Sequence, residues 1–571
     1  MTAIFTLHRD RRKQIGCEAI ALPLFRRTTA HVWLFALTVL IVPPWVGPTP
    51  VNAAGGSLTL ICQEESDQSP TITRAQIWRG NPAGKMIPIR RTVSAGIGVV
   101  LDRSTELTLA DGPYAFRMIR GPEYRVITGT FTLERSSLDD HTVQLPRMVS
   151  MIENGWTSGD CLVVAAPQSL PLRMASEDLH LATTLGDMAA APIPHRDKDD
   201  PIGCEPIWIS TDAVHHDGLV IYGDQRRAGK SAADDAESDK TSEDDTTAQQ
   251  ASDRQASDRQ ASPDDLLPIA NVVAAKNAST ETRVAIENPF AWPLPVWLAS
   301  ERVDGIFVIG DWLRLDRKVL SVKTGRKPPG GGLGGGQAVG RWAEEIYRHC
   351  LDAGLRLPPL AGGGTDSAKT PVGYNRLYVA QMSSDAYNDA QIQRVESPKD
   401  WWAAAWQGQS VATNGPLLRP MLGGKIPGHV FKGRTGEVLQ IQPELSLSVR
   451  DPVEYLEVIH NNKVHYSARL DEFAKAGGRI PPLNAKESGW VIMRVITLYE
   501  DHYRAAISAP WYIDFDDQRR VSKTSVDFFQ QWLADYETQL KKHSADSLQA
   551  HAPYIRAARQ FWQQKSAVAV D

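Results

Sequence analysis

Residues whose types could do chemistry are widely spaced along this 571-residue chain. Two polar runs stand beside predicted strands, and in them Asn375, Arg376 and Asn414 either orient a ligand or simply end the strands. No G-x-S-x-G sequence places a serine nucleophile, so serine hydrolysis has no support. The cysteines show no C-x-x-C spacing, which argues against a cysteine-bound zinc ion.

Tryptophan supplies a second kind of chemistry, because its flat apolar face can stack on a sugar ring. Five tryptophans form the candidate group: Trp292, Trp297, Trp401, Trp402 and Trp406. They predict either a carbohydrate-binding groove or packing within a core, which is the usual fate of tryptophan. Polysaccharide binding therefore stays open as one function.

The overall charge and composition narrow the possible partners. The formal net charge is -5, and 42% of the residues are hydrophobic and 23% charged, which is typical of globular proteins. No basic stretch resembles the electrostatic footprint of a nucleic-acid-binding protein. We therefore expect no nucleic-acid partner.

Residues 1–54 predict export. Basic residues up to Arg27 precede the apolar run Val32–Val42, which prolines close ahead of small residues at Ala54. This order is typical of a signal peptide, and the run is shorter than the roughly 20 residues of a spanning helix. We expect a secreted or periplasmic protein, or one anchored to the membrane through this leader.

The remaining chain divides into regions by the period of its apolar residues. Alternating runs predict an N-terminal β-sandwich over 55–150 and a second β-sandwich over 411–520. Mixed strands and helices over 151–410 predict an α/β layer or barrel, interrupted by an acidic, repetitive and disordered insertion over 223–265. Residues 521–571 predict amphipathic helices. The fold class is therefore α+β, with several domains.

Individual elements can be placed within these regions. Buried strands are predicted at Leu219–Tyr222, Arg283–Ile286 and Gly305–Ile309, since each is a short apolar run bounded by turn residues. A helix is predicted from Arg341 to Cys350, and Asn461-Asn462 is predicted to be a turn between two strands.

Several motifs resemble a known family. They are Gly155–Asp160, Arg120–Tyr124, Glu287–Phe290, Pro295–Leu298, Pro371–Arg376, Thr413–Leu418, Ser488–Trp490 and Pro510–Tyr512. Together they resemble the exported CehA/McbA-type metallohydrolases of the polymerase and histidinol phosphatase (PHP) superfamily. The resemblance implies a PHP-type α/β barrel for residues 151–410 and metal-dependent hydrolysis as the ancestral activity.

The histidines that this resemblance implies are missing. The family carries an H-x-H pair on the strand after Gly-Asp, where this chain has Leu162 and Val164, and aliphatic side chains have no lone pair for a metal. The T-D-H motif is absent from Ala182–Gly186. A late G-S-D turn becomes Gly364–Ala368, which keeps Asp366 without a following histidine.

The metal-ligand candidates that remain are Asp160, Asp366 and Glu177. The histidines His180, His215 and His216 would add ligands only if the fold brings them together. A hydrolytic metal site needs several ligands and an open position for water, which Asp160 and Asp366 alone do not supply. We expect no cofactor, and a divalent Zn, Mn or Fe ion only if the protein is active.

We predict a degenerate metallohydrolase-like protein that is catalytically inactive and keeps its scaffold to bind an unknown ligand or partner. Two alternatives stay open. One is an active metal-dependent phosphoesterase or hydrolase with non-standard ligands, and the other is a surface protein that binds polysaccharide.

Overall fold

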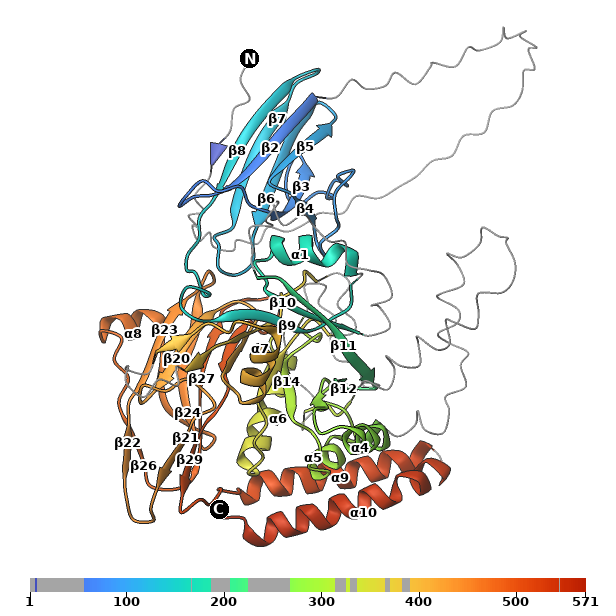
Figure 1. Ribbon diagram of the computed structural model, residues 1–571, viewed down its shortest axis with the longest axis vertical. Helices are drawn as coiled ribbons and strands as arrows, with labels where there is room; N and C mark the ends of the chain where they lie inside the picture. The colour runs from blue at the N-terminus through green and yellow to red at the C-terminus, as the bar shows by residue number, and fades with distance from the viewer. Residues whose placement is uncertain are drawn as a thin grey trace, which may run out of the picture.

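The structure is a computed structural model of a mixed α+β molecule with several sheets (Figure 1). It describes residues 6–7, 56–165, 167–185, 206–223, 268–313, 325–328, 336–364, 370–382, 391–543 and 545–570. The apolar run of the leader, Asp366 and all but the first residue of the predicted acidic insertion lie outside these ranges. Within the described part of the chain, no helix has both the length and the apolar sequence needed to cross a membrane.

Two sheets face each other in the N-terminal region. Their strands are β1 (Thr6–Leu7), β2 (Gly56–Glu64), β3 (Thr73–Arg79), β4 (Val99–Leu101), β5 (Ser104–Leu109), β6 (Gly112–Ile119), β7 (Ile127–Leu133) and β8 (Leu138–Leu145). One sheet has the order β1-β7-β6-β3-β4 and the other β5-β2-β8. Alternate residues of β2, Leu58 and Leu60, pack against Ile77 and Phe116 of the opposite sheet. We call these two sheets the N-terminal sandwich.

A long curved sheet begins in the central region. Its first strands, in spatial order, are β9 (Thr157–Val163), β10 (Leu181–Leu185), β11 (Trp208–His216), β12 (Leu219–Tyr222), β13 (Arg283–Ile286), β14 (Gly305–Ile309) and β15 (Pro359–Ala361). The predicted strand ranges of β12, β13 and β14 are confirmed. The Gly364 N–H, just past β15, donates to the Leu162 carbonyl of β9 at 2.9 Å. This part of the sheet therefore curls until the segment after β15 reaches β9.

Helices cover the outside of this curved sheet. They are α1 (Leu170–Ser176), which follows a 3-10 turn (Pro167–Ser169), α4 (Pro268–Ala278), α5 (Leu294–Ala299), α6 (Ala338–Asp352) and α7 (Pro398–Trp406). The helix predicted from Arg341 to Cys350 is confirmed within α6. Gly159 of β9 has no side chain where Trp401 of α7 packs, since a Cβ there would lie 2.4 Å from the indole ring. The glycine lets α7 lie against the sheet.

The same sheet continues into the C-terminal region. Strand β16 (Arg376–Val379) pairs with β9, and β19 (Ser410–Thr413) pairs with both β16 and β28 (Ala505–Ser508). The domain boundary predicted at residue 411 thus falls inside a strand that joins two regions. Asn461 and Asn462 have φ angles of 49° and 62°, which confirms the predicted turn.

The other C-terminal elements surround a second apolar core. They are β17 (Gln381–Met382), β18 (Ile392–Gln393), β20 (Leu417–Leu422), β21 (Val430–Gly433), β22 (Leu439–Ile441), β23 (Pro443–Ser448), β24 (Val453–His460), β25 (Lys463–Ala468), α8 (Leu470–Lys475), β26 (Leu483–Ala485), β27 (Gly489–Thr497) and β29 (Trp511–Phe515). Strands β27, β24 and β25 extend the long sheet beyond β28.

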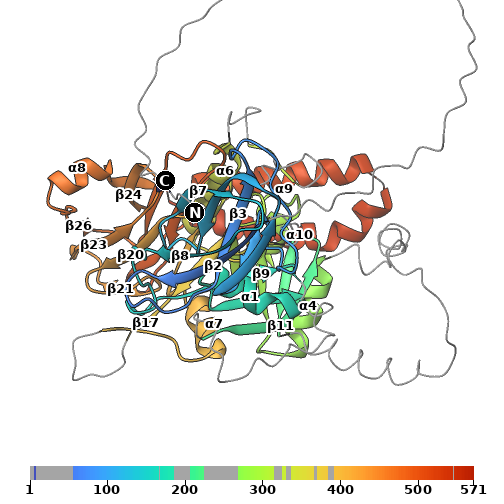
Figure 2. The same cartoon turned by 90° about the horizontal axis from the view of Figure 1, so that it is seen from above.

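Two long helices end the chain, α9 (Lys523–His543) and α10 (Ala545–Val568). They lie side by side, on the side of the molecule opposite the C-terminal strands (Figures 1 and 2). Trp532 and Trp562 are buried in the central core, and the Trp562 indole N–H donates to the Pro295 carbonyl of α5 at 3.0 Å. The amphipathic helices predicted from the sequence are confirmed.

Candidate functional site

Asp160 is a buried carboxylate on β9 whose two oxygens are both engaged by backbone groups. Oδ1 accepts the N–H of Leu162 at 3.2 Å and of Gly363 at 2.9 Å, and Oδ2 accepts the N–H of Gly373 at 2.9 Å. Burial raises the pKa of Asp160 to about 7, while these three N–H groups act to lower it. The carboxylate joins β9 to the segments that follow β15 and precede β16.

The neighbouring positions on β9 are apolar. Leu162 is fully buried and packs in the central core with Phe307 and Leu181, and Val164 is half-buried just after the strand. On β10, the hydroxyls of Thr183 and Thr184 are buried without a hydrogen-bond partner among the described residues. This end of the sheet offers hydrocarbon and hydroxyl groups where the family resemblance implies imidazoles.

The remaining metal-ligand candidates have separate partners. Glu177, just after α1, pairs with the Nε of Arg74 on β3. His180 Nδ1 lies 2.9 Å from the Ser158 hydroxyl, and burial lowers the pKa of this fully enclosed imidazole to about 4.

His215 is also held by a partner of its own, because its Nε2 lies 3.2 Å from Glu287 Oε2. Within the described ranges, no group of three or more His, Cys, Asp and Glu side chains is arranged to hold a metal ion. The residues that the structure describes therefore do not fit the metal centre that the resemblance implies, and Asp366 lies outside them.

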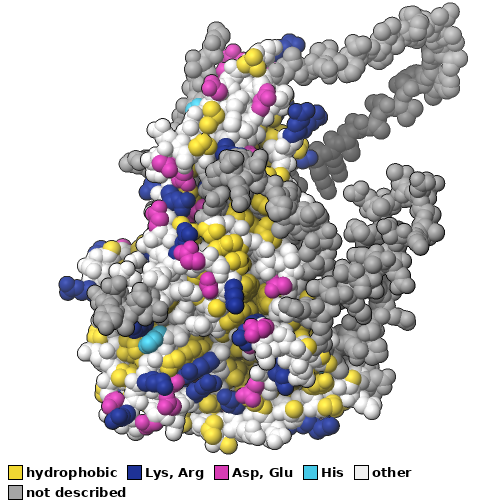
Figure 3. All heavy atoms as spheres, in the orientation of Figure 1, with side chains coloured by type: hydrophobic (Ala, Val, Ile, Leu, Met, Phe, Trp, Pro, Cys, Tyr) yellow, Lys and Arg dark blue, Asp and Glu magenta, His cyan; other side chains and the backbone are white. Residues whose placement is uncertain are grey.

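A deep cavity of about 1530 Å³ lies where the N-terminal sandwich meets the central and C-terminal regions. We call it the junction cavity. Strands β3, β6, β7 and β8 line one side, and the turns before β16, β20, β24 and β28 line the other. Its lining contains seven arginines and four acidic residues. Figure 3 shows basic and acidic side chains gathered along this junction.

Three segments that carry the family resemblance meet at the junction cavity. Arg120–Tyr124, Pro371–Arg376 and Thr413–Leu418 lie far apart in sequence, and each contributes residues to the lining. Gly121 has a φ of +54°, and a Cβ there would lie 2.1 Å from the Glu177 carbonyl oxygen. Only glycine therefore allows this turn of the N-terminal sandwich to approach the end of α1.

Two of the three predicted ligand-binding residues border this cavity. The fully buried Arg376 guanidinium donates to the carbonyls of Glu177 at 3.0 Å and Asp178 at 3.3 Å. Asn414 bridges two backbone groups, donating to the Tyr503 carbonyl at 2.9 Å and accepting from the Ala505 N–H at 2.8 Å. Both residues fix the cavity wall.

The third predicted residue, Asn375, does not line the cavity. Its side-chain amide donates to the carbonyls of Gly310 at 2.8 Å and of Leu313 and Gly362 at 3.2 Å. Asn375 therefore holds together the chain segments that leave β14 and β15.

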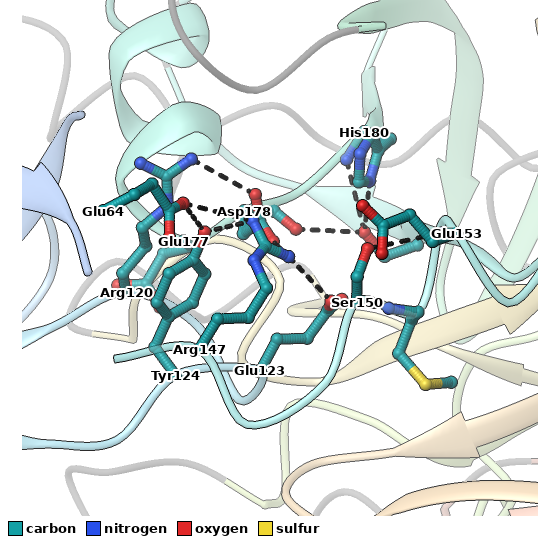
Figure 4. A network of polar contacts seen from close by, with 12 residues as sticks. Glu64, Arg120, Glu123, Tyr124, Arg147, Ser150, Glu153, Glu177, Asp178 and His180 are labelled. Carbon is teal, nitrogen blue, oxygen red and sulfur yellow. Dashed lines mark hydrogen bonds and ion pairs between the residues drawn. The ribbon is translucent and has the colours of Figure 1, made fainter. Parts of the chain in front are cut away.

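A buried polar network joins the N-terminal sandwich to the central sheet next to this cavity (Figure 4). Arg147 Nη1 lies 3.1 Å from Glu123 Oε2 and 3.0 Å from Asp178 Oδ2. Arg120 Nη2 lies 3.3 Å from the other oxygen of Asp178, and the Tyr124 hydroxyl bonds to Arg147. Two arginines from the sandwich thus clamp one aspartate that follows α1.

The two carboxyl groups of this network are shifted in opposite directions. Burial raises the pKa of Glu123 to about 7, and the charge of Asp178 adds to the rise. Burial acts on Asp178 in the same sense, but the charges of Arg120 and Arg147 prevail and hold the pKa of Asp178 well below its ordinary value. Asp178 is therefore the ionised member of the pair at neutral pH.

Arg450, in the turn between β23 and β24, lines the junction cavity and belongs to no motif that the sequence analysis singled out. Its Nη1 makes one long contact, 3.4 Å to the Tyr124 carbonyl, and no ion pair with any described carboxylate. The neighbouring Asp451 pairs instead with Arg504 at 3.0 Å. Burial lowers the pKa of Arg450 to about 10, and the adjacent charge of Arg504 adds to this.

Aromatic rings flank this pair of arginines. The Tyr374 hydroxyl lies 2.7 Å from His502 Nε2, and the Arg504 guanidinium lies over the Tyr499 ring at 4.9 Å. Burial raises the pKa of Tyr374 above its ordinary range, so this phenol stays protonated. The cavity wall therefore combines cationic and aromatic groups, which no spacing in the sequence indicates.

The tryptophans that predicted a sugar groove lie elsewhere. Trp297 and Trp401 are buried, and the Trp401 indole N–H donates to the Thr157 carbonyl at 3.0 Å. Trp402 and Trp406 are half-buried and stack on each other with ring centroids 5.2 Å apart. None of the five predicted tryptophans lines the junction cavity.

Comparisons of this chain with protein-family models, with curated proteins and with solved structures gave no match. The resemblance to PHP-type metallohydrolases depends on the sequence motifs alone.

Proposed function

We propose that this protein is an exported, metallohydrolase-like scaffold without catalytic metal chemistry, which acts by binding a ligand. One observation carries the proposal. The single candidate metal ligand on β9, Asp160, already accepts three backbone hydrogen bonds and stands beside the buried hydrocarbon of Leu162.

The chemical argument concerns the cost of freeing that carboxylate. A metal bound by Asp160 would compete with the N–H groups of Leu162, Gly363 and Gly373, and each buried donor left unpaired costs about 1–3 kcal/mol. A hydrolytic ion also needs further ligands and an open position for water. Leu162 cannot supply a ligand, so the geometry favours a structural role for Asp160.

One observation favours the alternative of an active, metal-dependent hydrolase. Glu287 pairs with His215 through Oε2, while its Oε1 is buried without a hydrogen-bond partner among the described residues. A Cβ on Gly364 would lie 2.9 Å from that oxygen. Glu287 and His215 would then have to serve as the non-standard metal ligands.

A turnover assay separates the two proposals. Purified full-length protein is incubated with p-nitrophenyl phosphate, bis(p-nitrophenyl) phosphate and p-nitrophenyl acetate, with zinc, manganese or iron added in turn. We expect no saturable, metal-dependent hydrolysis. Turnover that EDTA abolishes, and that Glu287→Gln removes without loss of folding, would establish the active hydrolase instead.

A further inference from the structure

We infer that the junction cavity is the binding site of this protein and that its ligand is an acidic oligosaccharide, with a carboxylate of the sugar held by Arg450. This inference rests on the proposed function, because it names the site and the ligand class of a protein that works by binding.

The carboxylates near Arg450 are paired with other arginines, which leaves its guanidinium available to bind an anion. The acidic side chains near it are already engaged, since Glu177 pairs with Arg74 and Asp451 pairs with Arg504. Within the described part of the chain, Arg450 makes no ion pair and only one long contact to a carbonyl. An incoming oxyanion is the partner that this guanidinium lacks.

The position of Arg450 suits recognition of a carboxylate. The side chain is half-buried in the cavity wall, so its guanidinium keeps access to the cavity while most of the surrounding water is excluded. Planar guanidinium groups bind carboxylates through two parallel N–H···O bonds, which are stronger than neutral hydrogen bonds. Burial, together with the charge of Arg504, lowers the pKa of Arg450 to about 10, so the guanidinium stays charged at neutral pH.

Two further arginines extend the positive surface toward solvent. Arg117 and Arg125 are exposed residues of the N-terminal sandwich and line the same cavity. Neither makes an ion pair with a described carboxylate. A ligand with several carboxylates along its length would therefore meet positive charge both at the inner wall and at the rim.

The size and polarity of the cavity indicate a hydroxyl-rich ligand longer than a single metabolite. Its volume of about 1530 Å³ exceeds the roughly 300–1,000 Å³ of most small-molecule sites. Gln76, Thr142 and Gln144 supply uncharged donors and acceptors, and Tyr374 and Tyr499 also line the cavity. An oligosaccharide of uronic acids combines these requirements.

Isothermal titration of the full-length protein tests the ligand class. The probes are hexagalacturonate, maltohexaose as a neutral sugar of equal length, hexaglutamate as an acidic peptide, and inorganic phosphate. We expect hexagalacturonate to bind at least about tenfold more tightly than each of the others, with an affinity that falls as salt is added.

Variants then test the site. We expect Arg450→Gln to weaken hexagalacturonate binding by about tenfold or more, and Arg450→Lys to weaken it less, because lysine keeps the charge but loses the paired N–H groups. Arg125→Gln at the exposed rim should weaken binding about two- to fivefold without affecting folding. Arg479→Gln is the matched control, since Arg479 is exposed and lies outside the cavity. Thermal melting of each variant verifies that it is folded.

The inference is overturned if no probe binds, if hexaglutamate or phosphate binds more tightly than hexagalacturonate, or if Arg450→Gln and Arg125→Gln bind like the control. None of these outcomes affects the turnover assay. Metal-dependent hydrolysis would refute the proposed function even if the uronate bound, so the two failures are distinguishable.

Discussion

The surroundings of Asp160 and Arg450 show two ways of placing a charged group inside one protein. Asp160 is fully buried, and its oxygens accept N–H groups from three segments of its own chain. Arg450 is half-buried, and among the described residues it makes a single long hydrogen bond, to the Tyr124 carbonyl. The adjacent Asp451 pairs with Arg504 instead. A charged group whose hydrogen-bonding atoms already have partners within the protein contributes to the stability of the fold. A charged group without such partners can bind a ligand instead.

The difference follows from what surrounds each group. A Cβ on Gly362 would lie 2.8 Å from Asp160 Oδ1, so only glycine there lets this segment approach closely enough for the Gly363 N–H to reach the carboxylate. Arg450 lies in a turn between two strands and faces a cavity wide enough for solvent. Close packing therefore excludes ligands from Asp160, whereas the cavity between the three regions leaves Arg450 accessible.

The largest change in the free energy of unfolding is expected from replacing Asp160. Asp160→Ala leaves the N–H groups of Leu162, Gly363 and Gly373 without their acceptor, and should lower the free energy of unfolding by about 3–5 kcal/mol. Urea denaturation measures the change.

Asp160→Asn is the matched control, because it keeps one carbonyl oxygen in nearly the same place. It should cost less than the alanine variant, about 1–2 kcal/mol. If the alanine variant unfolds at the same urea concentration as the wild type, Asp160 has no structural role and the comparison fails.

A smaller effect concerns the buried polar network in which Arg120 and Arg147 hold Asp178. The pKa of Glu123 is raised to about 7, above its ordinary value of 4.5, so the folded protein binds this proton more tightly than the unfolded chain. The resulting stability is fully present below the ordinary pKa and is lost as pH rises through about 7.

Glu123→Gln should remove this pH dependence. Between about pH 5 and about pH 8, the wild type should lose about 1–3 kcal/mol of unfolding free energy relative to the variant. Exposed Glu153 provides the control, since Glu153→Gln should keep the wild-type profile. Parallel profiles for wild type and Glu123→Gln would show that Glu123 is ionised on both sides of the transition.

The smallest effect should have the opposite sign. Arg450→Met removes a charge that forms no ion pair with a described carboxylate, that is desolvated by burial and that Arg504 repels, so the free energy of unfolding should rise by about 1 kcal/mol. A thermal melt would detect the increase. A clear loss of stability would mean that Arg450 is already well satisfied, and the contrast with Asp160 would disappear.

The sequence predicted the local elements better than their connections. Strands β12, β13 and β14 could be placed because each is a short apolar run between turn residues. The period of the sequence does not show that β19 joins β16 to β28 in one sheet, since pairing partners leave no local mark.

Some residues of the candidate site could likewise be predicted from the sequence, and others could not. Leu162 and Val164 could be recognised from one short segment, and so could the polar turns that hold Arg376 and Asn414. The importance of Arg450 could not, because its surroundings come from Tyr124 and Arg504, far away in sequence. Only the folded chain shows which acids are already paired.

Metal analysis of the purified full-length protein tests the central claim most directly. After dialysis against metal-free buffer, inductively coupled plasma mass spectrometry should find zinc, manganese and iron far below one ion per chain, since Asp160 is occupied and Leu162 cannot bind a metal. A stoichiometric ion that survives dialysis and is lost in Asp160→Asn would contradict this account.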